Sequence, residues 1–264
     1  MMRAVAVILA AVFCLPAAVF AQEWNAVKGK HFVVYFPELS ERQTAARVLR
    51  EAENYYRKIG DQIGYTRYHN FWTWDARVKI LLFPSHEAFV RTTGQPEWST
   101  GFADRDSQLF KSRVIVTYQQ EKDFFDGLLP HEISHLVLHD FLSGRPIPIW
   151  FDEGVAQLQE ASKSREADRI MRFLVSRSGY IPFPLLTRMD IRKEKDSRKV
   201  QVFYAQSLSV VEFLIRQYGS HAFADFCRAL RDGKNVEGAL RQAYTNKIDT
   251  ISQLEQKWLI YMNR

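Results

Sequence analysis

The chain has 264 residues and a net charge of +6, and 47% of its residues are hydrophobic against 25% charged. This balance is typical of a globular protein with one sizeable core, and it excludes a disordered or low-complexity chain. The charge does not indicate nucleic-acid binding, because no recognised binding motif accompanies it; a solvated basic surface explains it, and a preference for anionic envelope polymers or acidic substrates is the alternative.

The first 21 residues have the pattern of a secretory signal peptide. Arg3 supplies a positive start, residues 4–20 are apolar, and the small residues around Ala21 suit cleavage before Gln22. An uncleaved N-terminal anchor is the alternative, since the apolar run is slightly long for a signal. No later segment of the sequence is apolar and long enough to span a bilayer. We therefore expect an exported protein, periplasmic or secreted, with no stable membrane span once the signal is removed.

Removal of the signal leaves Cys227 as the only cysteine. The folded protein must then rest on its packed core rather than on an internal disulfide, and cysteines cannot supply a metal site. The sequence shows no internal repeat and no Gly/Ser-rich linker. We therefore expect residues 22–264 to form a single catalytic domain.

The chain begins with strands and continues with helices. Runs of β-branched and aromatic residues predict strands over 31–36, 78–83 and 113–118. Ser40 is expected to cap a helix whose apolar stripe ends at Gly60, whereas residues 94–110 are turn-rich and show little pattern. From about residue 124 the pattern predicts helices over roughly 126–141, 148–161, 165–177, 200–218, 221–232 and 249–262. The expected class is α+β.

Residues 131–135 read His-Glu-Ile-Ser-His, an H-E-x-x-H motif. In a helix, His131 and His135 lie about one turn apart on one face, so both imidazoles can reach a single ion. Glu132 is rotated off that face, from where it can act on a metal-bound water without being a ligand. Such a pentapeptide also arises by chance, and two histidines on a helix can be ordinary half-buried residues. The segment that follows the motif favours the metal site.

Glu153 lies 18 positions after His135, in the segment WFDEGVA at residues 150–156. A carboxylate on a helix flanked by aromatic residues is costly to bury without a partner, and a cation is such a partner. With the two histidines, Glu153 would complete three protein ligands and leave a fourth position open, as in catalytic zinc sites. The alternative is that Asp152 and Glu153 form a solvated first helical turn, where the helix dipole favours acids. We predict one Zn²⁺ ion at this site.

With these residues, the sequence resembles the gluzincin metallopeptidases, specifically the peptidase-MA-like proteins. The similarity rests on H-E-I-S-H followed by W-F-D-E-G-V-A, covers about residues 111–260, and includes a later helix at 199–219. It implies a zincin-like α+β fold, in which the zinc cleft lies between a small twisted mixed sheet and a helical C-terminal lobe. The resemblance also implies the roles of four residues: the metal ligands His131, His135 and Glu153 and the general base Glu132.

The resemblance further implies where a substrate would lie. The strand at 113–118 resembles the edge strand along which gluzincins lay an extended peptide, and Tyr204 matches the residue that steadies the oxyanion in relatives. A core tyrosine on an amphipathic helix is the alternative for Tyr204. The stretch 101–105 lacks the G-x-M-E-N pattern of the gluzincin aminopeptidases. The implied activity is therefore that of a zinc metallopeptidase, endopeptidase-like rather than aminopeptidase-like, in which Glu132 assists attack of zinc-bound water on a peptide or protein substrate.

Two other functions stay open: a zinc-binding but catalytically weak envelope binding or scaffold protein, and a zinc hydrolase of a non-peptide bond. The thermolysin-type aspartate four residues after the glutamate ligand is replaced by Gln157, so Asp152 or Asp140 is expected to orient a ligand histidine instead. His139 is expected to pack or cap. The mixed-charge run 188–199 is expected to be a solvated loop, with a lid as the alternative. The sequence does not specify the substrate, the partner proteins or the oligomeric state.

Overall fold

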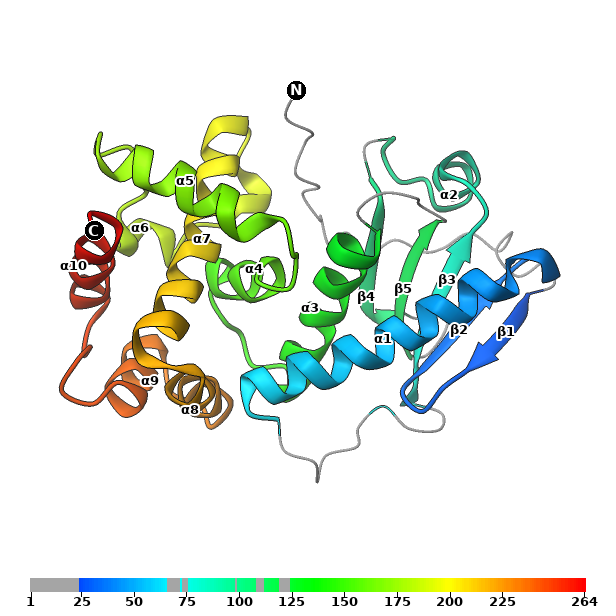
Figure 1. Cartoon of the computed structure of the whole chain (residues 1–264), viewed down its shortest axis with the longest axis horizontal. Coiled ribbons are helices and arrows are strands. Elements are labelled where there is room, and N and C mark those ends of the chain that lie inside the picture. The colour runs from blue at the N-terminus through cyan, green and yellow to red at the C-terminus, as the bar shows by residue number, and fades with distance from the viewer. Residues whose placement is uncertain (1–23, 66–71, 73–75, 98, 108–111, 119–123) are drawn as a thin grey trace. The chain divides into compact units, whose positions relative to one another are not determined.

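The computed structural model describes residues 24–65, 72, 76–97, 99–107, 112–118 and 124–264, so the expected signal peptide lies outside the described residues. Five strands form one sheet and most other elements are helical, which confirms the α+β class and is compatible with a zincin-like fold (Figure 1). The strands are β1 (Asn25–Lys28), β2 (Phe32–Phe36), β3 (Val78–Phe83), β4 (Gly101–Ser107) and β5 (Ser112–Tyr118). The helices are α1 (Arg42–Ile63), α2 (His86–Thr93), α3 (Leu129–Phe141), α4 (Ile149–Gln157), α5 (Lys163–Val175), α6 (Phe183–Leu186), α7 (Ser197–Tyr218), α8 (Ser220–Arg231), α9 (Val236–Ala243) and α10 (Ile251–Met262).

The chain divides into two compact units. The first comprises Met1–Arg57 and Arg67–Leu136, and the second comprises Lys58–Thr66 and Val137–Arg264. The sheet and α2 belong to the first unit, and α4 to α10 belong to the second. The residue ranges of helices α1 and α3 each begin in the first unit and end in the second. A single catalytic domain over residues 22–264 stays a prediction.

The sheet has the strand order β1-β2-β3-β5-β4. The three central strands β2, β3 and β5 run parallel to one another, whereas β1 pairs antiparallel with β2 and β4 pairs antiparallel with β5. The strand at 113–118 was expected at an edge, and this prediction is wrong: β5 is flanked by β3 and β4, and β4 forms the edge. β4 lies in the stretch that was expected to be turn-rich. It was not predicted as a strand because its sequence GFADRDS lacks the alternation and the β-branched residues that identify one.

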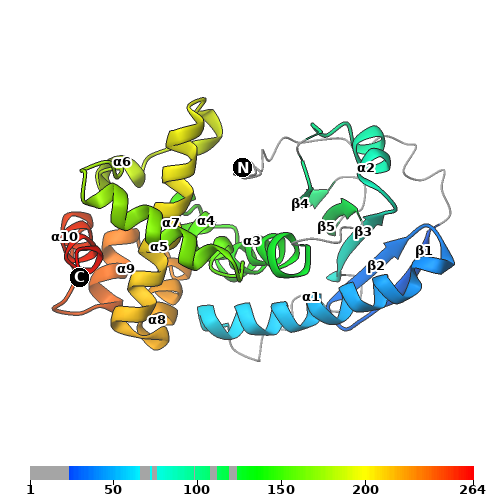
Figure 2. The same cartoon turned by 45° about the horizontal axis from the view of Figure 1, so that its top comes forward.

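Helices cover both faces of the sheet, with α1 on one side and α2 on the other (Figures 1 and 2). Phe89 of α2 packs in one apolar cluster with alternate residues of β3 and β5, namely Leu81, Phe83, Val114 and Val116. On the opposite face, the ring of Phe32 meets Tyr56 of α1 edge-on, with centroids 6.2 Å apart. Side chains of alternate residues thus point to opposite faces, and burial on both sides explains why β3 is a nearly continuous apolar run.

The predicted helix after the first strand exists, but its ends differ. Residues Leu39–Glu41 form a short 3₁₀ turn with a capping box between Glu38 and Glu41, so Ser40 does not cap α1. At the other end, α1 continues past Gly60 to Ile63. Among the described residues, the predictions from position 126 onward correspond to α3, α4, α5, α7, α8 and α10, while α2, α6 and α9 were not predicted because they are short.

The second unit has a core rich in aromatic residues. Phe151 of α4 packs against Phe226 of α8, with centroids 5.3 Å apart, and Phe226 in turn contacts Tyr244. Trp258 of α10 is completely buried and donates a hydrogen bond from its indole N–H to the Ser209 hydroxyl of α7 at 3.0 Å. Cys227 is also completely buried, and desolvation raises the pKa of its thiol far above the usual range.

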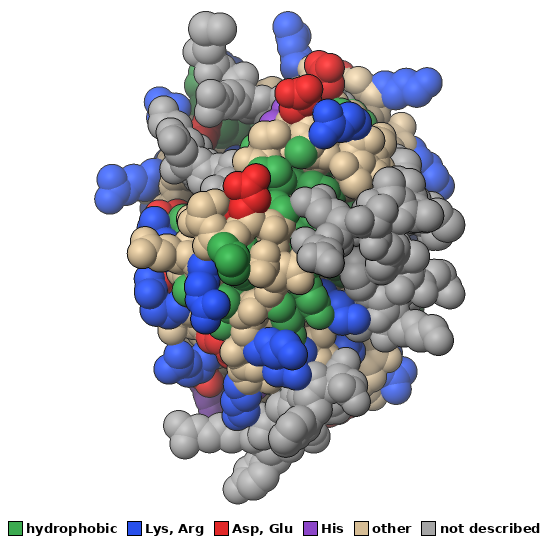
Figure 3. All heavy atoms as spheres, turned by 90° about the vertical axis from the view of Figure 1, so that its right-hand side faces the viewer, with side chains coloured by type: hydrophobic (Ala, Val, Ile, Leu, Met, Phe, Trp, Pro, Cys, Tyr) green, Lys and Arg blue, Asp and Glu red, His purple; other side chains and the backbone are tan. Residues whose placement is uncertain are grey.

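Among the described residues, the positive side chains on the face drawn in Figure 3 do not form a single block. Lys and Arg side chains are scattered around that face, with hydrophobic and uncharged side chains among them. This distribution favours a solvated basic surface there over a concentrated binding patch for a polyanion. Within the part of the chain that the structure describes, no helix has both the length and the apolar character needed to cross a membrane.

Candidate metal centre

The H-E-x-x-H motif lies on α3, as its spacing predicts. A π-helical turn at Phe124–Leu128 leads into the helix, and Pro130 is its second residue, where a missing N–H is tolerated. Ile133, Leu136 and Val137 are buried and anchor the helix in the core. The apolar side of α3 therefore fixes the direction in which its two histidines project.

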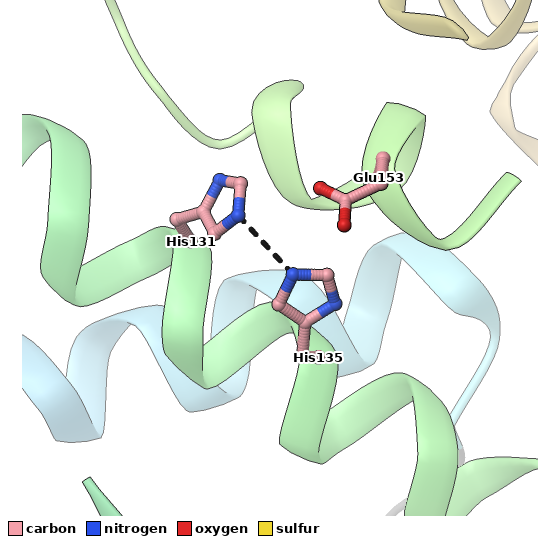
Figure 4. A group of neighbouring side chains, drawn as sticks. All are labelled: His131, His135 and Glu153. Carbon is pink, nitrogen blue, oxygen red and sulfur yellow. Dashed lines mark hydrogen bonds between the residues drawn. The ribbon is translucent and has the colours of Figure 1, made fainter. Parts of the chain in front are cut away.

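His131 and His135 face one another from successive turns of α3. Their Nε2 atoms lie 3.1 Å apart, and the ring planes are inclined at 76° (Figure 4). Zinc binds histidine nitrogen at roughly 2.0–2.1 Å, so two nitrogens in a tetrahedral zinc site are separated by about 3.3 Å. The two imidazoles thus already have nearly the separation that a shared zinc ion requires.

Glu153 supplies the third group. It lies on α4, its side chain is buried, and its carboxylate is turned toward the two imidazoles in Figure 4. One ligand atom from each of His131, His135 and Glu153 lies within 4.8 Å of the others. Two neutral nitrogens and one carboxylate form a donor set that suits zinc and leaves a coordination position for a reactant.

Gly154 fixes how closely α4 approaches α7. A Cβ at this position would collide with the backbone of Ser207 and with the side chain of Val211. Gln157 reinforces the contact, because its side-chain amide donates to the backbone carbonyl of Tyr204 at 3.1 Å. The residue that replaces the thermolysin-type aspartate therefore joins α4 to α7 and does not serve a metal ligand.

Glu132 and Tyr204 are both buried, but their surroundings differ. Glu132 is completely buried on α3, directly beside His131 in the chain. Tyr204 lies in the long buried stretch of α7, 3% exposed, with its ring edge-on to Phe203 at 5.7 Å. This packing is that of a core tyrosine, and its role as an oxyanion donor stays a prediction.

A second pair was not foreseen from the sequence. The Nε2 atom of His139, one turn beyond His135, lies 2.7 Å from Oδ2 of Asp152, the residue before Glu153. His135, His139 and Asp152 also form a group whose possible ligand atoms lie within 4.8 Å of one another. The repeat of histidines at 131, 135 and 139 was the available signal, because positions four apart share one face of a helix.

Arg192 is a further charged residue that acts on this region. Asp190 accepts hydrogen bonds from its Nε at 2.7 Å and from an Nη at 3.1 Å, forming a two-pronged ion pair. These bonds, together with the charge of Asp190 and the more distant charge of Glu153, raise the pKa of the Arg192 guanidinium. The mixed-charge run predicted as a loop thus contains a short 3₁₀ turn, Ile191–Lys193, and places a cation within electrostatic reach of a candidate ligand.

Comparison with known proteins identifies the family of the chain. No curated protein matches the chain. A family model described as the peptidase MA superfamily matches residues 86–263, from α2 to the last turn of α10. The match includes α3, α4 and α7, and it covers more than half of the chain. The protein is therefore a member of the peptidase MA superfamily.

Proposed function

We propose that this member of a peptidase superfamily is a zinc-dependent metallopeptidase of the endopeptidase type. The observation that carries the proposal is the grouping of three ligand atoms, two imidazole nitrogens from α3 and one carboxylate oxygen from α4. His131, His135 and Glu153 would hold one zinc ion. Bound there, zinc would supply Lewis-acid activation of a water molecule and of the scissile carbonyl.

Glu132 is proposed as the general base. It follows His131 on α3 and is rotated off the face of the two histidines, so it can act on a metal-bound water without being a ligand, and its complete burial keeps bulk water from competing for the proton. It would take the proton of the attacking water and then transfer it to the leaving amine. Tyr204 is proposed as the donor to the oxyanion, because the sequence resemblance to the gluzincins implies that role, although its packing is that of a core residue.

The edge strand β4 is proposed as the place where an extended substrate aligns. β4 ends the sheet on the side of β5, so one of its edges is available for pairing with another strand among the described residues. Gly101 at its start packs closely against Leu128, which leads directly into α3. A peptide bound along this edge would therefore pass near the start of the helix that carries the motif, and strand pairing does not require a free peptide end.

We also propose that the protein works outside the cytoplasm, in the periplasm or after secretion, with an uncleaved N-terminal anchor as the alternative. The support is the signal-peptide pattern of residues 1–21. N-terminal sequencing of protein recovered from the culture medium and from the envelope fraction tests this: a chain that begins at Gln22 supports cleavage, and a chain that keeps Arg3 contradicts it.

The activity is tested by metal content and peptide cleavage measured together. We expect about one zinc per wild-type chain, loss of most zinc in Glu153→Ala, and full zinc content in Glu132→Gln. Glu132→Gln should lower kcat by about 10²–10⁴-fold on a peptide-library substrate, because it removes the general base. Glu166→Gln, an equivalent change at an exposed position of α5, is the matched control and should alter neither property.

Each failure has a distinct meaning. Wild-type protein that binds no zinc even after reconstitution would contradict the metal site. Protein that binds one zinc but cleaves no peptide would favour the catalytically weak binding or scaffold protein. Cleavage that is unchanged in Glu132→Gln would reject this residue as the base while leaving the metal site intact.

A further inference from the structure

The hydrogen bond between His139 and Asp152 joins the two helices that carry the candidate ligands. It spans 2.7 Å, and both side chains are largely buried, with 15% of His139 and 18% of Asp152 exposed. Bonds that involve a carboxylate acceptor are about twice as strong as neutral ones, and a partly buried environment protects them from competing water. This bond is therefore a strong link between α3 and α4.

Its position along the chain relates it to the metal centre. His139 follows His135 by one helical turn, so it lies on the same side of α3 as the two ligand histidines. Asp152 immediately precedes Glu153 in the first turn of α4. A rotation of α4 that moved Glu153 away from the histidines would also move Asp152, and the bond to His139 resists that rotation.

The short distance distinguishes this link from a second metal site. A nitrogen and an oxygen that share a tetrahedral zinc ion are separated by roughly 3.3 Å, given metal–ligand bonds of about 2.0–2.1 Å. At 2.7 Å, His139 and Asp152 are at the distance of a direct hydrogen bond. The two side chains are therefore in direct contact, even though His135 lies near enough to complete a group of three possible ligands.

We propose that His139 and Asp152 form a positioning pair that fixes α4 relative to α3 and thereby sets where Glu153 meets His131 and His135. The inference rests on the proposed function, because it assumes that those three residues bind a metal ion. It assigns Asp152 as an acidic residue that organises the site. Neither member of the pair is a catalytic residue or a ligand.

The test is zinc affinity, measured by competition with a chelator, together with the visible absorption spectrum of the cobalt-substituted protein. Asp152→Ala and His139→Ala break the same bond from opposite sides, so the test survives if one variant does not fold. Each should weaken zinc binding about 10–100-fold, the usual effect of losing a residue that supports metal ligands, and should alter the cobalt spectrum. Asp152→Asn, whose amide oxygen can still accept from His139, should recover most of the affinity. Glu166→Gln removes a charge at an exposed position of α5 and is the control expected to keep wild-type affinity and spectrum.

The outcomes separate this inference from the proposed function. Wild-type zinc affinity and an unchanged cobalt spectrum in both alanine variants would overturn the positioning role and leave the metal site standing. Two zinc ions per wild-type chain, reduced to one in Asp152→Ala, would show that the pair is itself a metal site and would also overturn the inference. A wild-type protein without zinc affinity would overturn both.

Discussion

Gly154 of α4 lies so close to Ser207 of α7 that a Cβ on the glycine would be 2.5 Å from the Ser207 carbonyl oxygen. The same Cβ would lie 2.7 Å from a methyl group of Val211. Real Cβ atoms do not tolerate such distances to a backbone atom, so the two helices can pack in this way only with glycine at position 154. The glycine therefore sets the distance between the helix that carries Glu153 and the long helix α7.

Gly154→Ala should consequently destabilise the protein in spite of the higher helix propensity of alanine. We expect a loss of about 1–3 kcal/mol in the free energy of unfolding, as for other overpacked cores, measured by urea denaturation. Gly60→Ala in α1 is the control, because a Cβ there would meet Tyr65 at an ordinary 3.6 Å. It should be neutral or stabilise by up to about 1 kcal/mol. Equal effects of the two substitutions would contradict the close-approach argument.

Removal of the metal should lower stability only if the three ligand residues are intact. A ligand at 100 times its dissociation constant stabilises the folded state by about 2.7 kcal/mol, which for a chain of this size raises the melting temperature by roughly 5–10 °C. We expect this difference between zinc-loaded and chelator-treated wild type in a thermal melt. Glu153→Ala should melt at the same temperature with and without the chelator, and a shift of wild-type size in that variant would exclude Glu153 as a ligand.

Arg192→Gln should strengthen zinc binding a few-fold. The guanidinium interacts with the charge of Glu153, and a cation near a ligand opposes the binding of a second cation. The effect should be small and should diminish in high salt, because the Arg192 side chain is about half exposed to solvent. Arg188→Gln, an equal change of charge at an exposed position in the same run, is the control for net charge. Equal zinc affinities for the two variants, measured by chelator competition, would contradict the local interaction.

Glu53 should stabilise the first unit in a pH-dependent manner. Its carboxylate accepts from the backbone N–H of His31 at 2.8 Å and lies 2.6 Å from the His31 Nδ1 atom. Burial raises the pKa of this carboxyl. The hydrogen bonds from His31 together lower the pKa by more than burial raises it, so the pKa lies below its usual value. Because the folded pKa is lowered, the stabilisation is present above the unfolded pKa of about 4.3 and is lost as the pH falls through the folded pKa.

Glu53→Gln should therefore reduce the free energy of unfolding by about 1.5–3 kcal/mol at neutral pH, the range for a hydrogen bond to a charged group. The difference from wild type should shrink at an acid pH below the unfolded pKa of about 4.3, because the wild-type carboxyl becomes protonated as the pH falls through its lowered folded pKa. Urea denaturation at both pH values measures it. Glu51→Gln, a change at an ion pair near the surface of the same helix, should have an effect below about 1 kcal/mol. If Glu53→Gln lowers the free energy of unfolding by the same amount at both pH values, the loss of stability would come from altered packing and not from the lost charge.

The sequence predicted those helices and strands whose structure depends on residues near one another in the chain. The spacing of His131 and His135 defines one helical face without reference to the rest of the fold, and α3 presents them as expected. β3 and β5 were identified because burial on both faces requires continuous apolar runs. In each case the residues themselves contain the physical reason for the structure.

The missed features depend on contacts between distant segments. β4 gains its pairing from β5, not from its own propensity, and so the edge of the sheet was assigned to the wrong strand. The bond between His139 and Asp152 requires two helices to meet, and the sequence left the choice between Asp152 and Asp140 open. Local pattern cannot supply such information, because it does not determine which side chains of two separate helices come within hydrogen-bonding distance.

Cys227 offers a way to observe the second unit directly. The thiol is completely buried in α8, and its raised pKa keeps it protonated, so a thiol-specific reagent cannot modify it while the core is closed. Any opening of the packing around Phe226 exposes it. In the cleaved protein it would be the only thiol, and its labelling rate would then report how often this helical core opens, without an added probe.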